Sequence, residues 1–292
     1  MKKVLLTGAT GFLGSHLAKR LVAQGYEIIA LKRRTSSLAR LEECRERITF
    51  YDLEDLDLSL PFKNAGSINA VIHTATSYGR HGESASDILE ANATFPLHLL
   101  ETAIFFNTDT FFNTDTILYE YLNGYALSKK QFRDWGTLLS QKEKIRFVNL
   151  RLEHMYGPGD DSSKFTTHVV RSCLSNRETL DLTPGQQRRD FIYIDDVMDA
   201  YEVLLKNAAS IQGGFQDLDV GSGHATTIRE FVETTKRLAQ SATHLNFGAL
   251  PYRANEIMES YARPELLRSM GWVCRTSLTE GIQKTIEGER NR

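Results

Sequence analysis

The 292-residue sequence predicts an α/β protein built on a doubly wound parallel sheet, with a smaller C-terminal lobe. A short apolar run, Val4–Leu6, leads into three glycines spaced Gly-x-x-Gly-x-x-Gly, and a helical pattern follows, which indicates a strand, a tight turn and a helix. Further short apolar runs alternate with helical patterns, as in a sheet whose strands are joined by helices. The chain is long enough for one large domain or two unequal ones.

The composition excludes several classes of protein. Hydrophobic residues make up 41% and charged residues 25%, and the formal net charge is −2, so neither a nucleic acid nor a membrane surface is an expected partner. Cys44, Cys173 and Cys274 are odd in number and widely spaced, which argues against a disulfide framework and fits a reducing cytosol. No Cys/His spacing matches a zinc site, so we expect no metal.

The N-terminus could be mistaken for a signal peptide, because Met1-Lys2-Lys3 precedes apolar residues. The apolar run is too short for that and breaks at Thr7-Gly8, so we interpret it as the first strand. No stretch of the sequence approaches a transmembrane span, and we expect a cytoplasmic protein.

The glycine turn predicts a dinucleotide site. Glycines allow a sharp turn and a close approach of a pyrophosphate, which then lies at the positive end of the following helix. The residues expected to hold it are Gly8, Thr10, Gly11, Phe12, Leu13 and Gly14. The alternative is a tight strand–helix turn without a ligand.

The second predicted strand, Tyr26–Leu31, ends in a basic cluster. Where NAD-binding folds usually place an acid for the ribose 2′-hydroxyl, this chain has Lys32, Arg33 and Arg34. Guanidinium groups match phosphate oxygens, so the cluster favours the 2′-phosphate of NADP(H). The alternative is a solvated basic turn.

The next two predicted strands bring more candidates to the carboxyl edge of the sheet, where such sheets bind ligands. Ile48–Tyr51 leads to Asp52 and Leu53, expected at the adenine, and Ala70–Thr74 contains His73, which we expect to be a packed core residue. The strand end and the loop after it supply expected cofactor contacts, Thr74, Ala75 and Thr76, and expected substrate contacts, Tyr78 and Arg80.

A helix is expected from about Ser86 to Phe106, with a kink at Pro96. A tandem repeat follows, because Phe105–Thr110 and Phe111–Thr116 both read FFNTDT. We expect the second copy to form the fifth strand, since the first completes the helix and its turn. The other register would move the catalytic threonine.

Tyr125 and Lys129 lie four residues apart at the start of a helical pattern, so they share one helix face. An ammonium close to a phenol favours the phenolate, and we expect Lys129 to lower the pKa of Tyr125 toward neutrality. Such a tyrosine can exchange a proton with an alcohol or a carbonyl. Thr114 and Thr116 lie just before it, at the expected strand exit.

These motifs resemble the extended short-chain dehydrogenase/reductase family of sugar-nucleotide epimerases, dehydratases and reductases, over nearly the whole chain. The stretches that carry the resemblance are Thr7–Gly14, Tyr125–Lys129, Leu150–Asp160, Arg188–Val197, Arg253–Glu256 and Gly271-Trp272. The resemblance implies that Thr114, Tyr125 and Lys129 are catalytic. It also implies that Asn92 helps to hold the cofactor.

The resemblance further implies a substrate site in the later half of the chain. Arg189 and Arg253 would clamp the substrate pyrophosphate, and His154 and Lys164 would line the sugar-nucleotide site. Each arginine could instead be a solvated surface residue. A homodimer through helices next to the Tyr125–Lys129 element is also implied.

The later elements complete the predicted organisation. Helices are expected at Phe165–Leu174, Asp196–Lys206 and Ile228–Leu238, a strand at Phe191–Ile194 that returns to the main sheet, and a strand end at Leu218–Gly223. We assign residues 1–157 and 188–210 to a Rossmann domain that binds NADP(H), and residues 158–187 and 211–292 to the substrate-binding lobe. Cofactor and substrate would meet in the cleft between them.

The resemblance also bears on the reaction. The 4,6-dehydratase branch uses Thr-Asp-Glu after the fifth strand, whereas this chain has Thr114-Asp115-Thr116 and lacks the carboxylate base. With NADP(H), the simplest inference is a ketoreductase of a nucleotide-linked 4-keto-3,6-dideoxyhexose. Local stretches, including Ser77–Ser84 and Asn246–Met258, resemble the bacterial CDP-paratose synthases first and the CDP-abequose synthases second, groups that serve O-antigen synthesis. The alternatives are a sugar-nucleotide epimerase and a non-catalytic module that senses NADP(H).

Overall fold

The computed structural model describes residues 2–211, 214–254 and 256–292. The chain forms two compact units, the first made of Met1–Arg151 and Leu205–Leu218 and the second of Leu152–Leu204 and Asp219–Arg292. The main sheet belongs to the first unit and two small sheets belong to the second. The predicted segment 188–210 is divided between them, and which unit holds which ligand stays a prediction.

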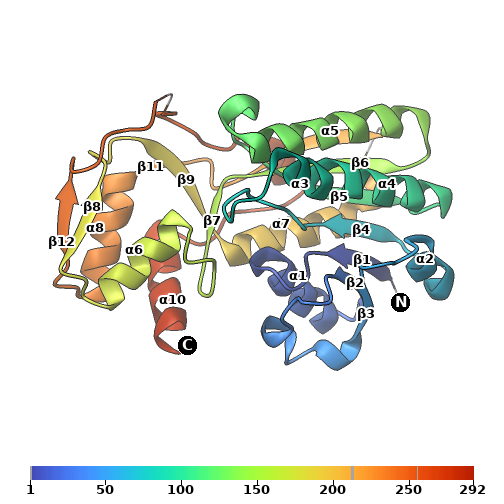
Figure 1. The fold of residues 1–292 in the computed structure, drawn as a ribbon, viewed down its shortest axis with the longest axis horizontal. Helices are drawn as coiled ribbons and strands as arrows, with labels where there is room; N and C mark the ends of the chain where they lie inside the picture. The colour runs from blue at the N-terminus through green and yellow to red at the C-terminus, as the bar shows by residue number, and fades with distance from the viewer. Residues whose placement is uncertain (1, 212–213, 255) are drawn as a thin grey trace. The chain divides into compact units, whose positions relative to one another are not determined.

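The first unit is built around a seven-stranded sheet in the order β10-β6-β5-β4-β1-β2-β3 (Figure 1). The strands are β1 (Lys3–Thr7), β2 (Glu27–Lys32), β3 (Ile48–Asp52), β4 (Ala70–His73), β5 (Thr110–Thr116), β6 (Arg146–Leu152) and β10 (Phe215–Val220). The pairs β1–β2, β1–β4, β2–β3 and β4–β5 are parallel. The order reverses between β1 and β4, and this confirms the doubly wound sheet expected from the sequence.

The inner strands are buried on both faces, as parallel strands between helices should be. All four residues of β4 are buried, and β1 and β2 are buried along four residues each. Apolar side chains from these strands and the neighbouring helices form one core, which includes Leu5, Ile29, Val71, Leu99, Phe111, Phe132 and Phe147. The glycine turn, the basic cluster and the segment Thr74–Thr76 follow the carboxyl ends of β1, β2 and β4 in this core.

The helices of the first unit are α1 (Phe12–Ala23), α2 (Ser59–Ala65), α3 (Ala85–Leu89), α4 (Phe95–Phe105) and α5 (Gly124–Lys142). Short 3₁₀ turns lie at Ala39–Leu41, Arg45–Arg47, Glu120–Leu122 and Ala208–Ser210. Helix α1 packs on β1 and β2, while α4 and α5 run side by side along the other strands (Figure 1).

The helix expected from Ser86 to Phe106 is present as a run of helical residues that contains a π-helical turn. A π-helical turn, η3 (Glu90–Thr94), separates α3 from α4, and Pro96 lies in the first turn of α4. Proline has no N–H and its ring clashes with the carbonyl four residues earlier, here that of Asn92. The wider π turn directly before Pro96 accommodates the proline within the run of helical residues.

The two copies of FFNTDT adopt different structures. The first ends α4 and its turn, and the second lies in β5. The predicted register of the fifth strand is therefore confirmed, which places Thr114 and Thr116 at the carboxyl end of β5.

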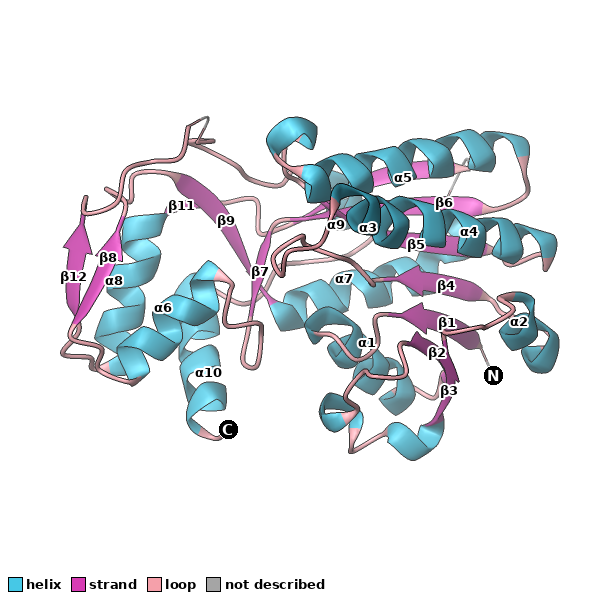
Figure 2. Cartoon of the chain, in the orientation of Figure 1, coloured by secondary structure: helices cyan, strands magenta, loops and turns pink. Residues whose placement is uncertain are grey.

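Among its described residues, the second unit contains two small sheets and five helices, the helix α7 in part (Figure 2). Its elements are β7 (His154–Tyr156), α6 (Phe165–Leu174), β8 (Thr179–Leu182), β9 (Arg188–Tyr193), α7 (Ile194–Asn207, up to Leu204), β11 (Ala225–Thr227), α8 (Ile228–Ala239), β12 (His244–Phe247), α9 (Glu265–Ser269) and α10 (Leu278–Arg290). Helix α8 begins as expected, because the Thr227 side chain accepts from the backbone N–H of Glu230 at 3.0 Å.

One strand of this unit differs from the prediction. The strand expected at Phe191–Ile194 does not return to the main sheet, because β9 pairs with β7 in parallel and with β11 in antiparallel orientation. Its buried Asp190 explains part of this placement. The Asp190 carboxylate accepts hydrogen bonds from the N–H groups of Ser222, Gly223 and Ala262 at 2.9, 2.8 and 3.1 Å, and these tie β9 to the loops of its own unit.

Within the described ranges, the structure contains no helix that is both long and apolar enough to cross a bilayer. Cys44, Cys173 and Cys274 are present as free thiols. Burial raises the pKa of all three, that of Cys274 to about 12, so they are protonated at neutral pH.

Candidate functional site

The glycine turn between β1 and α1 forms an open cradle. Gly8 has a φ of +71°, and a Cβ there would lie 2.6 Å from the backbone nitrogen of Ala75. A Cβ on Gly14 would lie 2.1 Å from the Gly8 carbonyl oxygen, so this glycine allows α1 to pack on the turn. Gly11 is exposed and stands at the N-cap of α1.

The N-terminus of α1 suits an anion. Its first turn has no acidic residue, and no side chain caps it. Free N–H groups at such an end attract negative charge, which fits the predicted pyrophosphate. Thr10, Phe12 and Leu13 complete the turn, and Arg40 reaches it from the first 3₁₀ turn, with its Nη1 3.4 Å from the Thr10 carbonyl oxygen. The sequence reading missed Arg40, because no motif links it to the glycines.

The basic cluster after β2 divides into two parts. Lys32 forms an ion pair with Asp52, so this lysine and this acid neutralise each other. Arg33 and Arg34 have exposed side chains, and the Arg34 backbone N–H is held by the Glu54 carboxylate at 2.9 and 3.1 Å. Leu53 donates its N–H to the Lys32 carbonyl at 2.8 Å, which fixes Asp52 and Leu53 beside the cluster. Arg33 and Arg34 are therefore the members of the cluster with exposed side chains.

His73 at the end of β4 is the core residue that was expected. Its side chain is fully buried, its Nδ1 lies 2.8 Å from the Thr7 hydroxyl, and it packs among Phe95, Phe111 and Phe132. Burial, together with the Lys129 charge, holds the pKa of His73 well below its ordinary value, so the ring is neutral.

Asn92 on the π turn clamps the segment after β4. Its Oδ1 accepts from the Thr76 hydroxyl at 3.0 Å and from the Ser77 N–H at 2.7 Å. Its Nδ2 donates to the Ser77 carbonyl at 2.8 Å and to the Ser128 hydroxyl at 3.0 Å. Of the expected cofactor contacts, Thr76 is thus linked through Asn92 to α5. Thr74 and Ala75 instead donate to Thr7 of β1, at 2.8 and 3.3 Å.

Helix α5 presents Tyr125 and Lys129 together. It starts immediately after Asn123, whose Oδ1 accepts from the Ala126 N–H at 2.9 Å and so caps the helix. Tyr125 therefore lies in the first turn, and the Thr116 side chain hydrogen-bonds to it. Of the two candidate threonines, Thr116 has this bond to Tyr125.

The predicted effect of Lys129 on Tyr125 is wrong for this structure. The pKa of Tyr125 lies well above its ordinary value, because burial disfavours the phenolate and the charges of Tyr78 and Asp115 add to this. The bond from Thr116 and the charge of Arg80 lower it only in part. Burial also lowers the pKa of Lys129 to about 8.

The loop after β4 places two further predicted residues at Tyr125. The rings of Tyr78 and Tyr125 lie 4.9 Å apart between centroids, and the Arg80 guanidinium carbon lies 4.9 Å from the Tyr78 ring centroid. The structure therefore brings Tyr78, Arg80, Thr116, Tyr125 and Lys129 together in the first unit.

The other predicted substrate residues belong to the second unit. Arg189 on β9 is buried and pairs with Glu256, whose N–H donates to the Arg253 carbonyl at 3.1 Å. The Arg253 side chain is exposed. The sequence reading missed Glu256 as a partner, although it lies three residues after Arg253 in the same motif.

His154 and Lys164 each pair with an acid. His154 Nδ1 lies 3.1 Å from the buried Glu153 carboxylate, which also accepts from the Ser260 hydroxyl at 2.6 Å. Lys164 Nζ lies 2.9 Å from Asp160 Oδ2. Burial raises the pKa of Asp160, and Lys164 opposes that shift.

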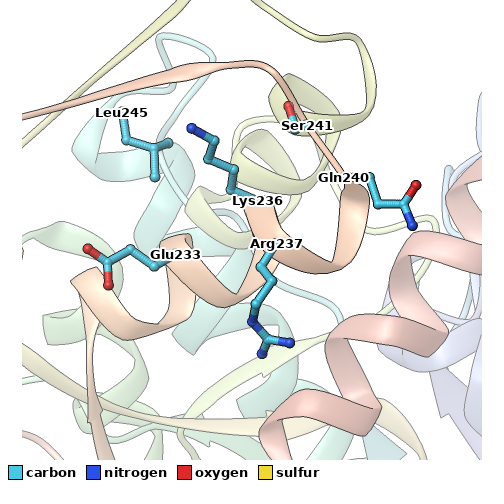
Figure 3. Close-up of a pocket in the computed structure, with 6 residues that line it drawn as sticks. All are labelled: Glu233, Lys236, Arg237, Gln240, Ser241 and Leu245. Atoms are coloured by element: carbon cyan, nitrogen blue, oxygen red, sulfur yellow. The ribbon is translucent and has the colours of Figure 1, made fainter.

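Two surface hollows lie away from these residues. One, of about 360 Å³, is lined by Glu233, Lys236, Arg237, Gln240, Ser241 and Leu245 at the end of α8 (Figure 3). The other, of about 270 Å³, lies over η3, α4 and α5 and is lined by Leu89, Ala93, Thr94, Leu97, Gln131 and Trp135. Neither contains a predicted site residue.

Comparison with known proteins agrees with the fold and its motifs. Residues 4–221 match the model of the NAD dependent epimerase/dehydratase family. The chain is 36% identical to a CDP-abequose synthase of Salmonella muenchen and 33% identical to one of Salmonella typhimurium, over 98% and 97% of this chain and 97% of each relative. It is 25% identical to a dTDP-4-dehydro-6-deoxyglucose reductase of Escherichia coli, over 98% of this chain and 97% of the relative.

Solved structures share the fold. A UDP-glucose 4-epimerase of Thermotoga maritima superposes with a TM-score of 0.86 at 21% identity, and one of Thermus thermophilus, in complex with NAD, with a TM-score of 0.83 at 23% identity; each comparison covers 99% of both chains. The glycine cradle, the Tyr125–Lys129 pair on α5 and these matches lead to one conclusion: the chain belongs to the NAD-dependent epimerase/dehydratase family, the extended short-chain dehydrogenases/reductases, which work with a nicotinamide dinucleotide.

Proposed function

We propose that the protein is a cytoplasmic, NADPH-dependent 4-ketoreductase of a CDP-linked 4-keto-3,6-dideoxyhexose. The observation that carries this proposal is Tyr125, a phenol kept protonated beside Thr116, Tyr78 and Arg80. A ketone that gains hydride needs a proton donor, and a protonated phenol is one.

The chain's residues have separate roles in the proposed reaction. NADPH, when bound in the glycine cradle, supplies the hydride that converts the C4 ketone to an alcohol. Thr116 hydrogen-bonds to the carbonyl oxygen, and Tyr125 gives it a proton, so the alcohol and NADP⁺ are the products. Lys129 holds the cofactor ribose, with Thr114 beside Thr116 on the same strand. Asn92 keeps Thr76 and Ser77 in place.

The proposed cofactor preference depends on Arg33 and Arg34. Both have exposed guanidinium groups beside the strand end where the ribose lies in such folds, and Lys32 is occupied by Asp52. The proposed substrate contacts in the second unit are Arg189 and Arg253 for the pyrophosphate, with His154 and Lys164 for the nucleotide sugar. Arg189 is already oriented by Glu256.

The substrate class rests on the relatives. Those at 36% and 33% identity bear the name CDP-abequose synthase, while local stretches of this chain resemble CDP-paratose synthases. The two products are C4 epimers, and we propose CDP-paratose. The hollow over η3, α4 and α5 is apolar and has exposed neighbours, so we also propose that the protein is a homodimer through this face.

The test is NADPH oxidation with a CDP-4-keto-3,6-dideoxyhexose, followed by NMR of the product. Turnover that Tyr125→Phe reduces by about 100-fold or more supports the reductase. NMR distinguishes paratose from abequose by the configuration at C4. Tightly bound NAD with activity in the absence of added cofactor would make the protein an epimerase. No turnover with any nucleotide-linked ketosugar, together with a biological role that Tyr125→Phe leaves intact, would indicate a sensor.

A further inference from the structure

An ion pair is buried beneath the end of β5. The side chains of Asp115 and Lys130 are 0% and 8% exposed, and Lys130 Nζ lies 3.1 Å from Asp115 Oδ2. Taking two charges out of water is expensive, and hydrophobic residues of similar volume usually serve stability equally well. A buried pair of this kind therefore suggests a role other than stability.

The pair holds both backbone polar groups of one residue, Thr116. The Thr116 backbone N–H donates to Asp115 Oδ1 at 2.7 Å, and Lys130 Nζ donates to the Thr116 carbonyl oxygen. Asn149 on β6 holds the carboxylate in place, since its Nδ2 donates to Asp115 Oδ2 at 2.9 Å. The backbone of Thr116 is thus fixed from both directions.

Lys130 belongs to the helix that carries Tyr125. It follows Lys129 on α5, and successive helix residues point about 100° apart, so one lysine faces β5 while its neighbour shares the face of Tyr125. The Thr116 hydroxyl hydrogen-bonds to Tyr125 and also accepts from the Leu118 N–H at 3.2 Å. The ion pair therefore ties the strand that bears Thr116 to the helix that bears Tyr125.

We infer that Asp115 and Lys130 are positioning residues, which lock Thr116 so that its hydroxyl stays at the Tyr125 phenol. This inference rests on the proposed reductase, in which both groups meet the substrate carbonyl. Asp115 does not act as an acid here, because Lys130, Asn149 and Thr116 already occupy its oxygens.

The pair is also electrically balanced beside the catalytic groups. Asp115 raises the pKa of both Tyr125 and Lys129, whereas Lys130 lowers the pKa of Lys129. Other charged or titratable neighbours of Tyr125, Lys129 and Asp115 are Arg80 and Tyr78, from the loop after β4, Arg133 on α5, and His73, which is neutral. Removing one member of the pair exposes Lys129 to the charge of the other.

The experiment is a double-mutant cycle between Lys130→Met and Thr116→Val, measured as kcat for ketone reduction with NADPH. Lys130→Met alone is expected to lower kcat by about 10- to 100-fold, the effect of a small misplacement of a reacting group, with the KM for NADPH within about twofold. In the Thr116→Val background, Lys130→Met is expected to have no further effect on kcat.

The matched control is Lys3→Met. Lys3 also bonds to a carbonyl oxygen, that of Ala65 at 2.6 Å, and pairs with a carboxylate, that of Glu27 at 3.7 Å, but it lies at the first residue of β1. Its removal is expected to leave kcat within about twofold of the unsubstituted protein, because it lies at the opposite end of a strand from the site. An equal loss of kcat in Lys3→Met and Lys130→Met, or full additivity in the cycle, would overturn the inference.

A titration that needs no substrate separates this inference from the proposed function. NMR of ¹³C-labelled lysine, assigned with Lys129→Ala, reports the pKa of Lys129. Lys130→Met is expected to raise this pKa and Asp115→Asn to lower it, while Lys3→Met leaves it unchanged. If both substitutions shift the pKa of Lys129 in the same direction, or neither shifts it, the inferred arrangement of Asp115 and Lys130 around Lys129 is overturned. An inactive unsubstituted protein would instead contradict the reductase. If Lys130→Met does not fold, Asp115→Asn serves in both measurements.

Discussion

At the level of single residues, the chemistry depends on which groups hold protons. The Tyr125 phenol stays protonated because burial outweighs its favourable neighbours, whereas burial pushes the Lys129 ammonium toward deprotonation. The same desolvation thus acts with opposite sign on the two residues. Their titration is the most direct view of the site before any ligand binds.

The lowered pKa of Lys129 predicts a basic limb in the pH profile. Lys129 titrates at about 8 in the free protein and is charged below that value. If the charged form holds the cofactor, kcat/KM for NADPH falls as the pH rises through this value, since kcat/KM reports the free enzyme. The limb of kcat is expected at higher pH, because the bound phosphates favour the ammonium. A profile of kcat/KM that is flat up to the ordinary pKa of lysine would contradict this.

Arg33 predicts the cofactor preference. Arg33→Ala is expected to raise the KM for NADPH by about tenfold, the loss of one partly solvated charge-assisted contact to a phosphate, and to leave the KM for NADH within about twofold. Steady-state kinetics with both cofactors measures the difference. Arg45→Ala, which removes an exposed arginine from the turn before β3, is the control. Equal changes in the KM for NADPH and the KM for NADH would contradict a role of Arg33 in binding the 2′-phosphate.

At the level of elements, the π turn η3 and helix α5 form one support. Asn92 links the segment after β4 to Ser128 on α5 through four hydrogen bonds of 2.7–3.0 Å. Ser128 lies between Tyr125 and Lys129 on the same helix, so the clamp joins Thr76 and Ser77 to the helix that carries the proposed proton donor. A regular α-helical turn has fewer residues per turn than the π turn, so it would direct the Asn92 side chain differently.

Removing this clamp should cost stability. Asn92→Ala leaves buried polar groups without partners and is expected to lower the free energy of unfolding by about 1–3 kcal/mol. Urea denaturation followed by circular dichroism measures the change. Asn64→Ala, which loses an exposed 2.9 Å bond to the Tyr51 hydroxyl, is the control and is expected to change it by less than about 1 kcal/mol. Equal effects would mean that Asn92 only fills space.

The elements show what a sequence can predict and what it cannot. The glycine turn, the parallel strands and the second FFNTDT copy in β5 were predictable, because each has a local signature in hydrophobic pattern or turn chemistry. The sheet that β9 joins was not predictable, because the pairing of β9 with β7 depends on contacts between residues distant in sequence. The direction of the Tyr125 pKa was not predictable either, because it depends on tertiary burial and on Asp115.

The partners of the site residues followed the same division. That Tyr125 and Lys129 share a helix face follows from their spacing, but the hydrogen bond of Thr116 to Tyr125 depends on how the chain leaves β5. The hydrogen bonds of Asp115 and Lys130 to the Thr116 backbone join β5 to α5. No sequence motif predicts these bonds.

At the level of the whole molecule, an exposed apolar surface on neighbouring helices predicts self-association. Leu89 and Trp135, which line the apolar hollow over η3, α4 and α5, are 43% and 49% exposed, and Leu138 on α5 is 40% exposed. Exposed apolar groups gathered on neighbouring helices are typical of an interaction surface. We expect two copies of the chain to bury them against each other.

Trp135→Glu tests this expectation. A buried charge without a partner would weaken the interface by several kcal/mol, so the variant is expected to be a monomer where the unsubstituted protein is a dimer. Light scattering coupled to size-exclusion chromatography measures the mass. Val273→Glu, a change at a 56% exposed residue of the second unit, is the control and should leave the mass unchanged. A monomeric unsubstituted protein would contradict the proposed dimer.

The duplicated hexapeptide has a consequence for how the chain finds its register. A shift of the central strand by one whole copy would put the same letters into the sheet, so the strand's own side chains cannot tell the two arrangements apart. The choice must come from outside the duplicated stretch. In the shifted arrangement, Phe105–Thr110 would form the strand, so the turn before it would have to be made from α4 itself, whose Leu99, Leu100 and Ala103 are buried. The packing of α4 therefore selects the alignment of β5, because only the observed arrangement lets this helix run to Phe105.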